Sequence, residues 1–125
     1  MRALATTLFA LTLTHAASAE GAGQSPSPVA EIVTFRLVPG TDPADFVAAA
    51  QAMGPFLRGT GAMVQRTLSV DADGLWTDHI TWTSLAAAKA AAEAMFAQPE
   101  AAPFMAMIAE DGMTMRHAPI SLQME

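Results

Sequence analysis

One histidine and two arginines, His79, Arg36 and Arg116, are the side chains of this sequence best suited to chemistry. Each lies in a segment where polar and apolar residues alternate, so strand geometry would place all three on one side of a sheet. Imidazole groups gain and lose a proton near neutral pH and suit proton transfer from an activated phenol or enol. A guanidinium group can hold a carboxylate or an enolate. His79 is therefore the candidate catalytic residue, and the two arginines are candidate ligand-binding residues.

Three further polar side chains, Thr34, Gln65 and Thr81, fall on the same predicted face and are candidates for binding a ligand. The face is rich in threonine, whereas a solvated sheet face usually carries more lysine and glutamate. This composition indicates a sheltered cavity or an interface. Plainer explanations remain for each residue type, because threonine favours strands, a lone histidine can be a hydrogen-bonding spacer, and arginines form ion pairs at interfaces.

The predicted strands that hold these residues cover 30–38, 63–70, 75–82 and 113–123. Amphipathic helices are predicted at 43–57 and 85–96, and a short helical piece follows at 104–108. The apolar stripe of the second helix is expected to consist of Leu85, Ala88, Ala92, Met95 and Phe96. The order strand, helix, strand, strand, helix, strand predicts an α+β fold in which both helices cover one face of a four-stranded antiparallel sheet. The other face must then be covered by something else, usually another subunit or a ligand.

Short local signals predict where these elements begin and end. Asp42 and Ser84 are expected helix N-caps. The Gly-Pro pair at 54–55 should kink or fray the end of the first helix, because proline removes a hydrogen bond. The turn-forming cluster at 71–74 predicts a hairpin between the second and third strands. Pro119 cannot donate to a ladder, so the last strand should be an edge strand or bulged there.

The alternating apolar positions predict which strand residues face the helices: Val33, Phe35, Leu37, Val64, Leu68, Val70, Trp76, Ile80, Trp82, Met113 and Met115. The same alternation places a carboxylate, Asp78, on this apolar face. Arg66 falls on that face too, opposite Asp78 or one diagonal away across the hairpin. A cross-strand ion pair is the economical explanation for both charges.

The first nineteen residues predict a secretory signal peptide. Arg2 supplies its positive start, residues 4–13 are apolar, and Ala17-Ser18-Ala19 matches the small-residue cleavage pattern, so the mature chain would begin at Glu20. A membrane anchor is the alternative, but the apolar run is shorter than the roughly 20 residues that span a bilayer. We therefore expect a protein exported to the periplasm or the medium, with no membrane partner after cleavage.

Residues 20–29 are small and proline-rich and predict a flexible leader, and residues 30–125 suffice for one domain. Signal cleavage leaves five Lys and Arg against twelve Asp and Glu, a formal charge of about −7. Such a chain repels phosphate backbones, so no nucleic-acid partner is expected. The sequence has no cysteine, which excludes thiol catalysis and Cys-based metal sites. It also lacks a Gly-rich phosphate loop and the HExxH and GxSxG patterns.

A different hypothesis comes from Met113, Met115 and His117, which share one face of the last predicted strand. Thioethers and an imidazole suit Cu(I) in an exported protein. However, same-face neighbours on a strand lie about 6.5 to 7 Å apart, so three of them converge poorly on one ion. Methionine as flexible core filler is the plainer explanation, and we predict no metal site.

From about residue 30 to residue 124, the sequence resembles the ferredoxin-like dimeric α+β barrel superfamily, in particular the antibiotic biosynthesis monooxygenase-like group. The most specific part is LWTDHITWTSLAAAKAA at 75–91, where the third strand leads through a Trp-x-Ser step into an Ala-rich helix. The resemblance implies a homodimer in which two sheets face each other and the sides turned from the helices line a barrel. Members that degrade haem place a histidine ligand in the second helix. Residues 85–96 contain no histidine, so haem degradation is not expected.

The resemblance further implies chemistry without a cofactor, since several members oxidise polycyclic substrates without metal or flavin. Together with the polar sheet face, it predicts an exported homodimer that encloses a small organic ligand, phenolic or enolisable, between each sheet and its partner. Oxidation or isomerisation without a cofactor is the leading enzymatic hypothesis. A ligand-binding or interaction module without catalysis is the alternative.

Overall fold

The computed structural model describes residues 27–125. Its elements in chain order are β1 (Val29–Phe35), α1 (Pro43–Ala52), α2 (Gly54–Gly59), β2 (Met63–Val70), β3 (Trp76–Trp82), α3 (Leu85–Met95), α4 (Ala101–Ala106) and β4 (Thr114–Pro119). The predicted signal peptide and most of the predicted leader lie outside the described residues. Val29, which we expected to end the leader, is instead the buried first residue of β1.

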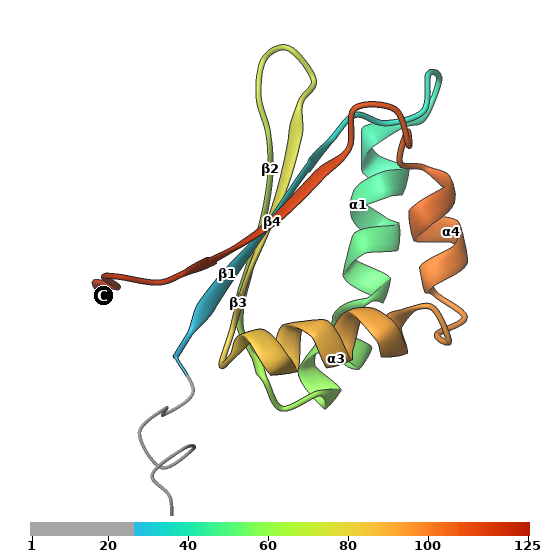
Figure 1. The fold of residues 1–125 in the computed structure, drawn as a ribbon. Helices are drawn as coiled ribbons and strands as arrows, with labels where there is room; N and C mark the ends of the chain where they lie inside the picture. Colours follow the sequence, from blue (N-terminus) through green and yellow to red (C-terminus); the bar gives the residue numbers. More distant parts are fainter. Residues whose placement is uncertain (1–26) are drawn as a thin grey trace, which may run out of the picture.

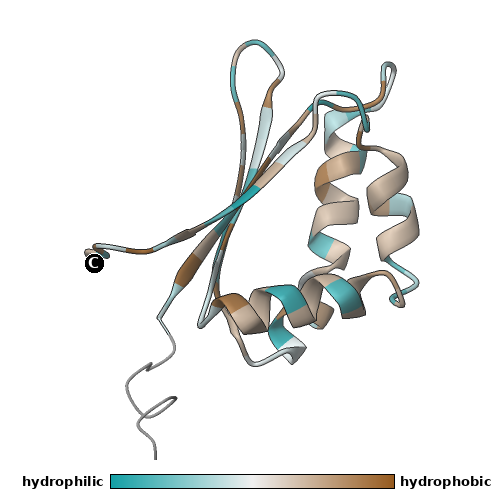
Figure 2. Ribbon diagram, viewed as in Figure 1, coloured by the Kyte–Doolittle hydropathy of each residue, from teal (hydrophilic) through white to brown (hydrophobic). Residues whose placement is uncertain are grey.

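The four strands form one antiparallel sheet in the order β2-β3-β1-β4, which confirms the predicted ferredoxin-like α+β fold. All helices lie on one face of the sheet (Figure 1). Helices α1 and α4 lie side by side, and α3 runs across their lower ends (Figure 1). In the described part of the chain no helix covers the other face. Hydropathy follows this layering, because α1 and α4 are mostly apolar whereas α3 carries hydrophilic bands (Figure 2).

The predicted first helix is divided in two at the Gly-Pro pair. Asp42 caps α1, since its Oδ1 accepts a hydrogen bond of 2.8 Å from the Ala44 amide. α1 ends at Ala52, and α2 begins at Gly54 with proline in its first turn. The residue between them, Met53, is almost fully buried. The break lets both short helices turn an apolar side to the sheet.

Helix α3 begins as expected, with Ser84 Oγ accepting from the Ala87 amide at 3.1 Å. Its buried positions are Ala88 and Ala91, whereas the expected stripe residues Leu85 and Phe96 are exposed. The small alanine side chains let α3 approach the sheet closely, and the large residues at its two ends project past the packed region. The predicted stripe was therefore wrong at both ends of the helix.

Two strands also depart from the simple alternation. The pairing of β2 with β3 shifts between Met63 and Gln65, so Val64 is the extra residue of a bulge. Met63 packs against the core, and Val64, which we predicted to face the helices, is exposed. Strand β4 ends at Pro119 rather than near 123, because Pro119 pairs with Val29, the first residue of β1. One more hydrogen bond, from the Ile120 amide to the Pro28 carbonyl at 3.0 Å, follows this last pair. β4 is an edge strand, as Pro119 predicted.

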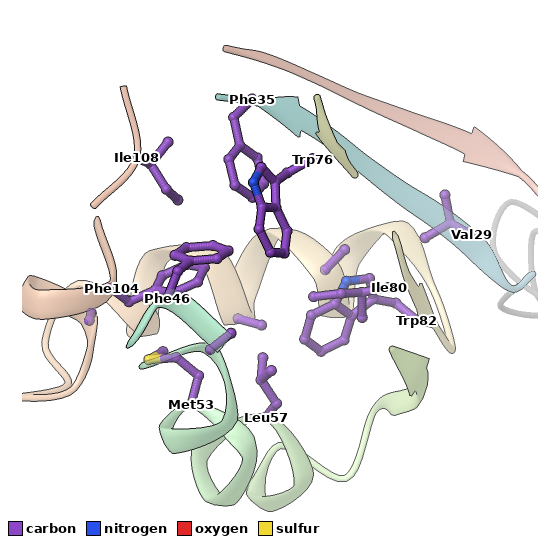
Figure 3. Packing of buried hydrophobic residues seen from close by; sticks show 14 residues of the cluster. Val29, Phe35, Phe46, Met53, Leu57, Trp76, Ile80, Trp82, Phe104 and Ile108 are labelled. Atoms are coloured by element: carbon purple, nitrogen blue, oxygen red, sulfur yellow. The ribbon is translucent and has the colours of Figure 1, made fainter. Parts of the chain in front are cut away.

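An aromatic cluster joins the sheet to the helices. Phe46 of α1 is fully buried and lies edge-on to Phe35 and Trp76, with ring centroids 5.5 and 5.0 Å away. It stacks on Phe104 of α4 at 5.4 Å. Figure 3 shows Phe46 and Phe104 beside Met53, with Phe35 and Trp76 of the sheet above them. This cluster fixes α1 and α4 against the middle of the sheet.

None of the helices formed by residues 27–125 has the length and apolar character needed to cross a membrane.

Candidate functional site

A cavity of about 180 Å³ lies between the sheet and the helices, beside the aromatic cluster. Most of its wall is apolar and comes from every layer of the fold: Val33, Phe35, Met53, Phe56, Leu57, Ile80, Trp82, Ala91, Ala92, Met95, Phe96, Phe104, Met105, Ile108, Met113 and Met115. In Figure 3, Met53 and Leu57 from the helices lie across from Ile80 and Trp82 of the sheet. Such a wall suits an apolar ligand.

The opening of the cavity is apolar as well. Phe96, at the end of α3, has 70 % of its surface exposed. Met113 and Met115, on or just before the edge strand β4, are 39 % and 54 % exposed. All three belong to the cavity wall, so they form its rim. Their exposure corrects the prediction that both methionines pack under the helices, because none of the helices in residues 27–125 covers the outer edge of β4.

The wall also carries charge, from Arg66 and Asp78, and these two form the ion pair expected from strand alternation. Arg66 Nε donates to Asp78 Oδ1 at 2.9 Å, and Nη2 donates to Oδ2 at 2.6 Å. The remaining guanidinium nitrogen, Nη1, donates to the Ala50 carbonyl at 2.8 Å. The pair sits diagonally across β2 and β3 and ties both strands to the last turn of α1. Both Asp78 oxygens are thus occupied.

The third charged group of the wall is Glu31 of β1, which is only 8 % exposed. It is paired with His117 across β1 and β4, and the imidazole Nε2 lies 2.8 Å from Glu31 Oε2. A proton on Nε2 would make the imidazole the donor to an ionised carboxylate. Among the described residues no group donates a hydrogen bond to Oε1. Glu31 is therefore held at one oxygen, whereas Asp78 is held at both.

The indole of Trp82 is the remaining polar group of the wall. Its Nε1 is buried and has no hydrogen-bond partner among residues 27–125. An N–H group without an acceptor costs about 1–3 kcal/mol of desolvation.

The predicted site residues lie on the opposite face of the sheet. His79 and Arg116 both pair with Ile32, one from each side. Two strand spacings separate them, about 9.6 Å between backbones. Both side chains are exposed, and in the described part of the chain no hydrogen bond joins His79 to an arginine. The structure therefore places His79 and Arg116 on one face without bringing them together in a single chain.

The other predicted ligand-binding residues share that face but have separate partners. Arg36 Nη1 donates to the Asp73 carbonyl at 2.6 Å, which fastens the hairpin loop. The hydroxyl groups of Thr34 and Thr114 hydrogen-bond to each other across β1 and β4. Gln65 is exposed and Thr81 is buried. The roles of these residues stay predictions, since each depends on what covers this face.

Sequence reasoning did not single out Glu31. The signal was present, because Glu31 shares its alternation with Val33 and Phe35 and is thus an acid on the apolar side of β1. The same argument had identified Asp78. Glu31 was missed because its partner, His117, lies 86 residues further along the chain, where no hairpin suggests the pairing.

One of the three side chains considered as copper ligands has another partner in the structure. Met113 and Met115 line the cavity, but His117 Nε2 is engaged by Glu31. Within residues 27–125 there is no group of three or more His, Cys, Asp or Glu side chains arranged to hold a metal ion. The methionines act here as cavity wall.

No protein family model matches the sequence. No curated protein sequence matches it either.

Solved structures match the fold. SnoaB, a cofactor-independent oxygenase from Streptomyces nogalater, has a TM-score of 0.56 and 20% identity over 79% of this chain and 96% of its own. A Bordetella bronchiseptica protein provisionally named an antibiotic biosynthesis monooxygenase has a TM-score of 0.66 and 17% identity over 77% and 99%. Hydroxynitrile lyase from Passiflora edulis has a TM-score of 0.55 and 17% identity over 81% and 100%.

The likeness confirms the resemblance to the antibiotic biosynthesis monooxygenase-like group at the level of the fold, a ferredoxin-like α+β sheet with its helices on one face. Identities this low carry the fold alone. The similar chains include both an oxygenase and a lyase. The fold therefore does not decide the reaction.

Proposed function

We propose that this protein binds a small, largely apolar organic molecule between its sheet and its helices and converts it without a cofactor, as a monooxygenase or an isomerase. The observation that carries the proposal is the apolar cavity with an apolar rim, into whose wall carboxylate and indole groups are set. The likeness in fold to a cofactor-independent oxygenase supports the reaction class.

The size of the cavity limits the substrate. Its volume of about 180 Å³ is smaller than the roughly 300 Å³ at the lower end of drug-sized pockets. A phenol or an enolisable ketone of one or two rings fits this volume and has the mostly apolar surface that the wall favours. Loss of a proton from such a molecule gives an enolate or phenolate. That anion either reacts with dioxygen, which is monooxygenase chemistry, or takes the proton back at another atom, which is isomerisation.

Filling the cavity should weaken ligand binding. Ala92 of α3 lines it, so in Ala92→Phe a benzyl group occupies the ligand volume. With 2-tetralone as the probe, we expect calorimetry to show a Kd at least tenfold higher for Ala92→Phe than for the unchanged protein. The matched control is Ala94→Phe, an exposed position of the same helix outside the wall. Equal affinity of all three proteins for the probe would contradict the proposed site.

Oxygen consumption separates the candidate reactions. Turnover of a phenol with uptake of dioxygen would identify a monooxygenase, and turnover without it an isomerase. Binding without turnover of any phenol or enolisable ketone tested would leave the alternative, a ligand-binding module without catalysis.

We further propose that a second copy of the chain covers the sheet face that bears His79 and Arg116. The support is the lack of helical cover on this face within the described residues, together with Ile32 at its centre. The chain should sediment with twice its own mass, and Ile32→Glu should sediment as a monomer because it places a charge at the centre of the contact. Val47→Glu, on the exposed side of α1, is the control. A monomer at high concentration would contradict the dimer.

A further inference from the structure

The two carboxylates of the cavity wall differ in a way that bears on chemistry. Asp78 receives hydrogen bonds from Arg66 at both oxygens and is neutralised by that guanidinium group. Among the described residues, the only hydrogen bond of the Glu31 side chain joins its Oε2 to Nε2 of His117. A carboxylate whose oxygens are both occupied by a guanidinium group is a poor base, whereas a carboxylate with a free oxygen can take up a proton.

The surroundings of Glu31 leave Oε1 for a ligand. Its nearest strand neighbours on the same face are Ile80 of β3 and His117 of β4. The wall residues from α1, α2, α3 and α4 and their ends are all apolar. Among the described residues of the wall, the only other charged side chains are Arg66 and Asp78, which offset each other. A substrate in the cavity would therefore contact Oε1 of Glu31, a carboxylate oxygen that accepts no hydrogen bond from the described residues.

We propose that Glu31 is the catalytic base of this cavity and that His117 is its positioning residue. A substrate C–H or O–H bond breaks, the proton goes to Oε1 of Glu31, and the bonding electron pair remains on the substrate as an enolate or phenolate. The imidazole donates from Nε2 to Oε2, which fixes the rotamer of the carboxylate and spreads its charge. This assignment rests on the proposed function, since it requires a ligand in the same cavity.

The assignment of Glu31 as the base also indicates which class of substrate suits the cavity wall. The apolar surroundings favour a neutral molecule, and burial of a bare anion would be costly. The substrate should therefore arrive protonated and lose its proton only when it lies against Glu31. We thus infer a neutral phenol or ketone, rather than a carboxylate or a phosphate, as the preferred ligand class.

The test is exchange of the acidic C–H protons of 2-tetralone for deuterium in D₂O, followed by proton NMR. Reversible proton transfer needs no oxidant, so exchange reports on the base alone. We expect the protein to accelerate exchange above the buffer rate and Glu31→Gln to reduce the enzymatic rate by a factor of roughly 100 to 10,000. The glutamine keeps the size of the side chain, and circular dichroism would verify that the variant folds.

Three further variants make the result specific. Glu31→Asp should retain part of the rate, because it keeps a carboxylate but withdraws it by one methylene. His117→Gln should lower kcat for exchange about tenfold with KM unchanged, because His117 does not touch the substrate. Glu93→Gln, on the exposed side of α3 and outside the cavity wall, should leave exchange unchanged.

The outcomes separate this inference from the proposed function. If 2-tetralone binds and Glu31→Gln exchanges as fast as the unchanged protein, Glu31 is not the base, and the proposed binding site stands. Glu31 is likewise ruled out as the base if the bound probe never exchanges above the buffer rate. If 2-tetralone does not bind, both proposals are overturned.

Discussion

Asp78→Ala should lower the free energy of unfolding by about 3–5 kcal/mol. Asp78 is buried and accepts every hydrogen bond that Arg66 donates to a side chain. Its removal leaves a guanidinium group in an apolar wall, where the Ala50 carbonyl is its remaining hydrogen-bond partner among the described residues. Loss of one member of a buried pair costs more than the pair contributes, because the other charge stays desolvated. Urea titration followed by circular dichroism measures the difference.

Two comparisons isolate the ion pair from a general effect of losing an acid. Asp73→Ala, at the exposed tip of the hairpin, should change stability little. The double variant Asp78→Leu with Arg66→Met should recover most of the loss, since an apolar pair of similar volume removes both desolvated charges. If Asp78→Ala unfolds at the same urea concentration as the unchanged protein, the pair has no structural role.

Phe46→Ala should destabilise the fold by a similar amount, about 3–5 kcal/mol. The side chain is fully buried and contacts Phe35 and Trp76 of the sheet and Phe104 of α4. Truncation removes buried apolar surface and leaves a void that these rigid rings cannot close. Thermal unfolding should show a correspondingly lower Tm.

Phe96→Ala provides the matched control for Phe46, because it deletes the same ring from a position that is 70 % exposed. We expect it to change stability by well under 1 kcal/mol, as exposed substitutions usually do. Equal losses in the two variants would mean that α1 is not held by the aromatic cluster.

The architecture could be predicted because several short-range signals in the sequence agreed. Alternation assigned the strands and their faces, Asp42 and Ser84 marked the helix starts, and the ion pair of Arg66 with Asp78 followed from the hairpin. These features depend on residues that are close in sequence or joined by a short turn. Their geometry is fixed by spacing alone.

The wrong predictions have a different origin. Each concerns a feature that depends on how a helix or strand packs against its neighbours. The bulge at Val64 changes the face of the sheet on which this side chain was expected. No Gly or Pro in β2 marks the position of the bulge in the sequence. Leu85 and Phe96 are exposed because α3 packs through its alanines. Alternation does not reveal which apolar strand positions lie beyond the helices, so the exposure of Met115 on the edge strand could not be read from the sequence.

The position of the candidate site shows the same limit. The polar sheet face drew attention to His79, because polar residues in a strand are visible in the sequence. A cavity is a property of packing among several elements. This cavity depends on the distance between α3 and the sheet. It also depends on the pairing of β1 with β4, which brings Glu31 next to His117. The two faces of the sheet therefore lead to separate predictions. The face toward the helices predicts a site inside each chain, and the opposite face predicts a site between two chains.

A crystal structure of this protein with 2-tetralone or a two-ring phenol of similar size tests the central claim most directly. We predict ligand density between Trp82 and Phe104, with a ligand oxygen or acidic carbon within reach of Glu31 Oε1. Density on the opposite face of the sheet beside His79, with the cavity between sheet and helices left empty, would contradict the claim.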